Sequence, residues 1–77
     1  MALTTRISAP VQSEINGKWC SAFENWRTFL DPSEDYMASS VVSAAVWPTE
    51  EAAEEASIRA LQTLETTGKY PNMCEPW

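Results

Sequence analysis

A predicted helix in the second half of the chain constrains the fold more than any other sequence feature. Pro48 breaks the preceding segment, and Thr49 follows it as a residue that commonly caps a helix N-terminus. Gly68 is a typical residue just beyond a helix C-terminus, and Pro71 prevents the helix from resuming. The sequence therefore predicts an α-helix over residues 49–67.

The two faces of this predicted helix differ in composition. At the period of an α-helix, one face is rich in alanine and the other is acidic. The first face holds Ala52, Ala53, Ala56, Ala60, Leu61 and Leu64, and the second holds Glu51, Glu54, Glu55, Arg59, Gln62 and Glu65. Small side chains let a helix lie close to the surface it covers, so we expect the alanine face to pack on a sheet. Ile58 interrupts the acidic face.

The pair Asn16-Gly17 predicts a β-hairpin, with strands over residues 4–14 and 18–29. A two-residue Asn-Gly loop would place Ile15 and Trp19 on opposite faces. A three-residue loop with Gly17 in the left-handed conformation pairs Glu14 with Lys18 instead. We favour this second register because it gathers the apolar side chains on one face, namely Ile7, Val11, Ile15, Trp19 and Phe23.

Residues 37–47 are rich in serine and β-branched side chains, which favours a third strand. In such a strand Met37, Val41 and Trp47 would share one face, and Val42 and Val46 would share the other. The predicted fold class is therefore α+β: a small antiparallel three-stranded sheet, made of the N-terminal hairpin and the third strand, covered by one helix.

An all-helical fold is the alternative. Trp19, Phe23, Trp26 and Leu30 recur at a spacing that also fits one face of a helix. That pattern allows a three-helix protein, with helices over residues 18–30, 33–46 and 49–67.

A chain of 77 residues suits a single domain, residues 1–77, with a thin core. We expect Trp19, Phe23, Phe29 and Trp47 in that core. The other aromatic residues are candidates for exposure, where Trp and Tyr often anchor interfaces: Trp26, Tyr36, Tyr70 and Trp77. We expect the tail, residues 69–77, to pack on the domain.

The net charge of −6 is unevenly distributed. Residues 1–30 hold three basic and two acidic residues, whereas residues 31–65 hold eight acidic residues and a single basic one, Arg59. Such a field repels nucleic acid and anionic membranes and attracts basic surfaces. We therefore expect a protein partner with a basic surface, such as a nucleic-acid-binding protein or complex. We expect no direct contact with nucleic acid or with a membrane.

The sequence lacks the residues on which most enzymes depend. It has no histidine, which removes the commonest general base and the commonest metal ligand. Two glycines are too few for a phosphate-binding loop, and Cys20 and Cys74 form no CxxC motif. We therefore expect no enzymatic activity, no cofactor and no metal ion, and we expect both cysteines to be reduced.

Three acidic residues follow Leu30 closely: Asp31, Glu34 and Asp35. Such a group of oxygen ligands suits a hard cation such as Mg²⁺ or Ca²⁺. An aspartate before Pro32 is also typical of a polar turn, and we favour the turn.

The candidate partner-binding residues are Trp26, Asp31, Glu34, Asp35, Tyr36, Glu51, Glu54, Glu55 and Ile58. We expect a non-enzymatic protein that binds, and inhibits, another macromolecule through a basic surface of that partner. In size, acidity and lack of catalytic groups the chain resembles the small acidic inhibitors that bacteriophages make against host machinery, anti-CRISPR proteins among them. The resemblance implies action in the cytoplasm of a host cell. One version of this hypothesis is that the acidic rows mimic nucleic acid. The alternative is a homo-oligomeric assembly protein, a homodimer in the simplest case.

Overall fold

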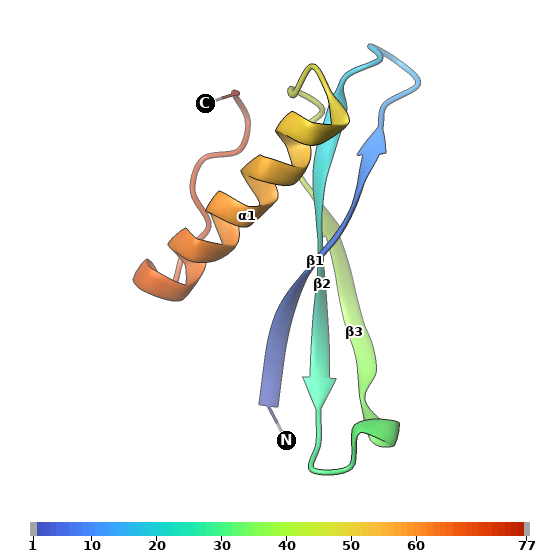
Figure 1. Cartoon of the computed structure of the whole chain (residues 1–77), viewed down its shortest axis with the longest axis vertical. Helices are drawn as coiled ribbons and strands as arrows, with labels where there is room; N and C mark the ends of the chain where they lie inside the picture. Colours follow the sequence, from blue (N-terminus) through green and yellow to red (C-terminus); the bar gives the residue numbers. More distant parts are fainter. Residues whose placement is uncertain (1, 77) are drawn as a thin grey trace.

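The computed structural model describes residues 2–76 and confirms the α+β fold. Its elements are strand β1 (Ala2–Gln12), strand β2 (Trp19–Thr28), the 3-10 helix η1 (Pro32–Glu34), strand β3 (Tyr36–Val42) and helix α1 (Glu50–Thr67). The strands form one antiparallel sheet with β2 in the centre, and α1 lies against one face of it (Figure 1). The three-helix alternative is wrong, because β2 is paired with a strand on each side.

The helix covers only one end of this elongated sheet. The molecule is 41 Å long, and α1 packs mainly on β1 and β2, at the end where the β1–β2 turn lies (Figure 1). The 3-10 helix η1 lies at the opposite end (Figure 1). Every residue of β3 is exposed, so residues 2–76 leave this edge of the sheet uncovered.

The predicted hairpin register is wrong, because the β1–β2 loop is longer than expected. Gln12 pairs with Trp19, and the Ser13 N–H donates to the Lys18 carbonyl at 2.8 Å. Gly17 does adopt the left-handed conformation, with φ of 71°. The Asn16 amide donates to the carbonyl of Ala45 at 3.1 Å, which ties this loop to the segment after β3. Ile15 does not join the apolar face and is 97% exposed at the loop tip.

A bulge in β1 also separates two residues that we expected on one face. Ser8 pairs with Ala22 and Val11 pairs with Cys20, so β1 contains one extra residue between these pairs. Pro10, which has no N–H to donate, lies in the bulge. Ile7 therefore faces α1, whereas Val11 lies on the other face.

The third strand is shorter than predicted and also contains a bulge. It ends at Val42, and its register shifts so that Met37 lies opposite Trp26 and Val41 opposite Phe23. Met37 and Val41 therefore lie on opposite faces, contrary to the prediction. Trp47 forms only an isolated bridge with Trp19, in which the Trp19 N–H donates to the Trp47 carbonyl at 2.7 Å.

Both predicted ends of the helix are confirmed. The Thr49 side-chain oxygen accepts a hydrogen bond from the Ala52 N–H at 3.1 Å, so Thr49 is the N-cap. Gly68 ends the helix in the left-handed conformation, with φ of 77°, and its N–H donates to the Leu64 carbonyl at 2.8 Å. The helix is therefore limited by its local sequence at each end.

Alanines and two serines bring α1 close to β2. Of the α1 residues, Ala53, Ala56, Ser57 and Ala60 are buried. The hydroxyls of Ser21 and Ser57 both donate to the Ala53 carbonyl, at 2.7 and 3.0 Å. These bonds satisfy both buried hydroxyls, a contact that the apolar pattern did not predict.

Two of the four expected core aromatics are buried. Phe23 is 2% exposed and Trp47 is 3% exposed, and Trp19 is half-buried and packs against Trp47. Phe29 is also half-buried, but it lies beyond β2, with its ring 6.1 Å from that of Tyr36. The core is therefore small and concentrated beneath α1.

The tail after α1 runs back along the domain. The ring of Tyr70 lies 5.4 Å from that of Phe23, and Met73 packs against the cluster around Trp47. The expectation for Trp77 falls outside the described residues.

Candidate functional site

The structure divides the predicted partner-binding residues among three places. Glu51, Glu54, Glu55 and Ile58 share the outward side of α1. Asp31, Glu34, Asp35 and Tyr36 lie in and next to η1, at the other end of the molecule (Figure 1). Trp26 lies on the face of the sheet that α1 does not cover. The nine residues therefore cannot form one continuous contact surface.

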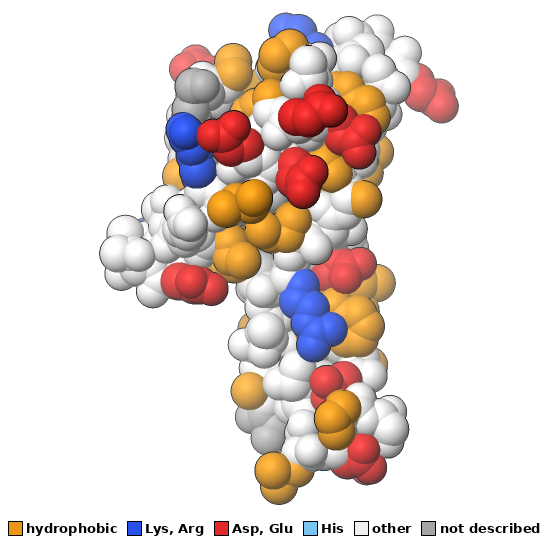
Figure 2. Space-filling view, in the orientation of Figure 1, with side chains coloured by type: hydrophobic (Ala, Val, Ile, Leu, Met, Phe, Trp, Pro, Cys, Tyr) orange, Lys and Arg blue, Asp and Glu red, His pale blue; other side chains and the backbone are white. Residues whose placement is uncertain are grey.

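We call the outward side of α1 the acidic face; it consists of Glu50, Glu51, Glu54, Glu55, Ile58, Gln62 and Glu65. Ile58 is 44% exposed and lies at its centre, with Glu54 and Glu55 one turn earlier and Gln62 one turn later. Acidic side chains gather over the helix next to an apolar patch (Figure 2). An exposed apolar residue inside a charged rim is the usual arrangement of a small protein interface.

The acidic face opposes the stability of its own helix. Carboxylates one turn apart repel each other, and the face contains three such pairs, Glu50 with Glu54, Glu51 with Glu54 and Glu51 with Glu55. Glu65 is near the helix C-terminus, where the helix dipole disfavours a negative charge, and the last turn holds no basic residue. Glu50 and Glu51 suit the first turn, but the remaining acids have no local stabilising role apart from the single pair made by Glu55.

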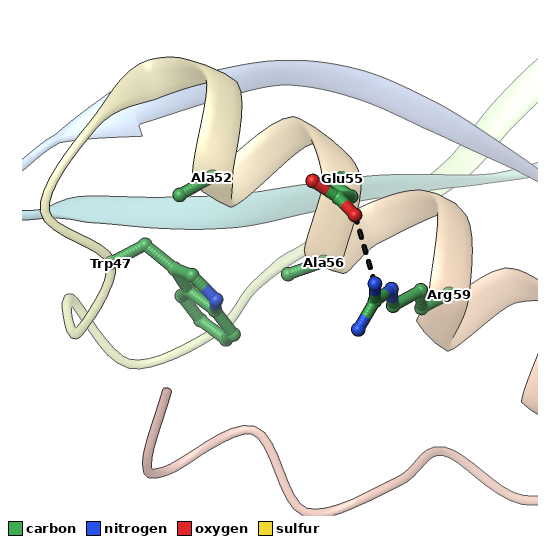
Figure 3. Close-up of a pocket in the computed structure, with 5 residues that line it drawn as sticks. All are labelled: Trp47, Ala52, Glu55, Ala56 and Arg59. Carbon is green, nitrogen blue, oxygen red and sulfur yellow. Dashed lines mark hydrogen bonds and ion pairs between the residues drawn. The ribbon is translucent and has the colours of Figure 1, made fainter. Parts of the chain in front are cut away.

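That pair borders a shallow hollow beside the helix (Figure 3). Trp47, Ala52 and Ala56 line the hollow, which has a volume of about 270 Å³. At its rim Arg59 binds Glu55 with a nitrogen–oxygen distance of 2.9 Å, and both side chains are more than half exposed. The Glu55 carboxylate at the hollow is paired with Arg59 and largely exposed to solvent, so we assign the hollow no chemistry. Arg59 neutralises only the Glu55 edge of the acidic face.

The acidic residues around η1 hold their own loop together. The Asp31 carboxylate caps η1, and the Asp35 carboxylate accepts the Phe29 N–H at 2.8 Å. Both residues are therefore part of a polar turn, the interpretation that the sequence favoured. Within residues 2–76, no three carboxylates or thiols lie close enough together to hold a metal ion. Glu34 is exposed but isolated from the acidic face.

The hydrogen bonds of this cap lead to a testable prediction about the pKa of Asp31. The backbone N–H and the hydroxyl of Ser33 donate to its carboxylate at 3.1 and 2.9 Å, and these bonds hold the pKa of Asp31 below its ordinary value. The loop therefore keeps this cap at neutral pH and loses it only as the pH falls through that lowered pKa. In a carboxyl NMR titration, Ser33→Ala should raise the pKa of Asp31, whereas the control Ser39→Ala should not.

Trp26 belongs to a polar cluster on the uncovered face of the sheet. Its indole N–H donates to the Glu24 carboxylate at 3.1 Å, and the Arg6 guanidinium lies 4.8 Å from the centre of its ring. Ser21 and Phe23, which alternate with Glu24 along β2, point instead to the α1 side. The structure therefore separates Trp26 from the acidic face by the thickness of the sheet.

The acidic face contains Glu50 and Glu65, which the sequence-based candidate set omitted. Their signal was available in the helical period, which places both on the same side of the helix as Ile58, about two turns from it. Within residues 2–76, none of the helices has both the length and the apolar character needed to cross a membrane. Comparisons with protein-family models, with curated proteins and with solved structures found no match to this chain.

Proposed function

We propose that this chain is a non-enzymatic binding protein that uses the acidic face of α1 to occupy, and so inhibit, a basic surface on another protein. One observation carries the proposal: carboxylates surround the exposed Ile58 although their placement costs the helix stability. Residues that break a local stability rule without a compensating contact are often retained for function.

The chemistry of the acidic face indicates the kind of partner. Lysine and arginine side chains would pair with Glu51, Glu54 and Glu65, and an apolar contact at Ile58 would add specificity that charge alone cannot supply. A surface that ordinarily binds nucleic acid offers such cations, and the acidic face would then compete with nucleic acid for it.

The setting that we propose is inhibition of host machinery in the cytoplasm of a host cell. Small acidic inhibitors made by bacteriophages, anti-CRISPR proteins among them, combine small size, acidity and absence of catalytic groups in the same way. The support from this chain is its charge, its size and the position of the acidic face on a rigid helix capped at both ends.

A trade-off between stability and binding tests this proposal. The double variant Glu54→Gln and Glu65→Gln should raise the free energy of unfolding by roughly 0.5–1 kcal/mol, because it removes repulsion and an unfavourable dipole contact. The melting temperature should rise by about 2–8 °C. The same variant should capture less partner from a lysate of cells that make the protein, as measured by quantitative mass spectrometry.

The matched control for this trade-off is the double variant Glu14→Gln and Glu75→Gln, which removes two exposed carboxylates outside the acidic face. It should leave both the melting temperature and the capture of partner unchanged. If the α1 variant gained stability without losing partner, the acidic face would not be the binding surface.

A further inference from the structure

β3 is an edge strand that lacks charged residues and proline, and its bulge lies before Ser39, so the segment from Ser39 to Val42 pairs regularly with β2. All seven of its residues are exposed, and none is charged or a proline. The opposite edge strand, β1, carries Arg6 and Pro10, contains a bulge and is partly covered by α1. Of the two sheet edges, β3 is therefore the one open to another strand.

The hydrogen bonds between β3 and β2 identify which backbone groups lie at the free edge. The Ser43 N–H donates to the Ser21 carbonyl at 2.8 Å. In an antiparallel ladder, such residues alternate with residues whose N–H and C=O groups point away from the neighbouring strand. The backbone N–H and C=O groups of Val41 therefore point towards β2, like those of Ser43. The backbone groups of Ser40 and Val42 point outward, to the free edge.

We propose that this edge binds the same edge of a second copy of the chain, antiparallel, around a two-fold axis at Val41. In this register Ser40 lies opposite Val42 of the other copy, so the outward N–H and C=O groups of both residues are paired. If the axis lay at another residue of β3, the outward groups of Ser40 and Val42 would not all be paired. They would then lie opposite the bulge before Ser39 or opposite residues after Ser43, which are not in a strand. Val41 then meets its own counterpart on the α1 side of the sheet.

Charge and burial favour a second copy as the occupant of this edge. Each chain carries a net charge of −6, so two copies repel each other least where the surfaces in contact are uncharged. Among the strands in residues 2–76, β3 alone has no charged residue, and α1, which carries the acidic face, packs on β1 and β2. Val41 and Val42 are 45% and 54% exposed, and pairing would bury part of both side chains.

The pairing would extend the proposed function without depending on it. Antiparallel pairing keeps each face of the sheet continuous across the axis, so both α1 helices would lie on the same side. The dimer would present two acidic faces together, which strengthens binding to a partner with two basic sites. Because the edge is short, we expect a reversible dimer with a dissociation constant on the order of 100 µM.

A charge-swap experiment on Val41 tests the register directly. Sedimentation of the wild type between about 10 µM and 1 mM should show the mass rising from 8.6 kDa towards twice that value. Val41→Lys and Val41→Glu should each dimerise at least tenfold more weakly, because either charge meets its own copy at the axis. An equimolar mixture of the two variants should dimerise within about threefold of the wild type, because opposite charges then meet.

Hydrogen exchange provides a second measurement that needs no variant. Protection of the Ser40 and Val42 amides should rise with protein concentration, whereas protection of Val41 should not. A wild type that stays monomeric to 1 mM, or a mixture that fails to pair, would overturn the proposed dimer, as would concentration-independent protection of the two amides.

The proposed dimer and the proposed binding role of the acidic face can be tested independently of each other. Ile58→Glu should weaken capture of the partner and leave the dimer intact, and added salt should strengthen the dimer by screening the like net charges of its copies. Added salt should weaken partner capture, because the charges in that contact are opposite. The two salt responses therefore distinguish the two surfaces.

Discussion

Replacing Phe23 with alanine is expected to lower the free energy of unfolding by about 3–5 kcal/mol, which is the usual cost of removing a buried aromatic ring. A domain of this length has a total stability of roughly 4–12 kcal/mol, so the variant should be close to unfolding at room temperature. Phe23 is the largest fully buried side chain among the described residues, and the buried helix residues facing the sheet are alanines and a serine. The variant also loses the contact with the Tyr70 ring, whose centre lies 5.4 Å from that of Phe23. Urea unfolding followed by circular dichroism measures the loss.

Phe29→Ala is the matched control, because it removes the same side chain from a half-buried position outside the core beneath α1. It should cost roughly 1–2 kcal/mol. If the two variants were equally stable, the fold would not depend on the contact of α1 and the tail with β2.

The elements of the fold were predictable because their signals are local. Thr49 and Gly68 mark the helix ends by hydrogen bonds within a few residues, and the apolar and acidic periods of the helix are continuous between them. The Asn16-Gly17 pair likewise identified the hairpin, and Gly17 adopts the expected left-handed conformation. Those signals do not depend on distant parts of the chain.

Strand registers were not predictable, because each depends on contacts between distant segments. The bulges in β1 and β3 each insert one residue and so exchange the faces of everything beyond them. Asn16 binds the carbonyl of Ala45, which the hairpin sequence alone cannot reveal. The pairing of Ser21 and Ser57 with one carbonyl also requires α1 and β2 to be placed first.

The positions of the candidate site residues were also predictable only where they depend on local structure. Residues on α1 were grouped correctly because one helix fixes their mutual positions. The acids after Leu30 were counted with them by charge, although Asp31 and Asp35 are used as hydrogen-bond acceptors within their own loop. Charge alone could not show that these acids lie far from α1, and the binding surface that we propose is limited to the acidic face.

Reversing charge on the acidic face is expected to have the largest effect on binding. The triple variant Glu51→Lys, Glu54→Lys and Glu55→Lys would place cations opposite a basic surface, so partner capture should fall at least about tenfold. Its control is Glu14→Lys, Glu34→Lys and Glu75→Lys, which makes the same change in net charge at exposed positions outside the acidic face. Circular dichroism should show both triple variants folded, and Ile58→Glu provides a single-site test of the same surface.

Quantitative capture with these two triple variants, from one lysate at one salt concentration, tests the central claim most directly. If the acidic face binds the partner, the α1 variant should capture at least about tenfold less partner than the wild type. The amount captured by the control variant should fall by less than about twofold. Equal losses would mean that only net charge matters. Full capture by the α1 variant would contradict the assignment of the acidic face as the binding surface.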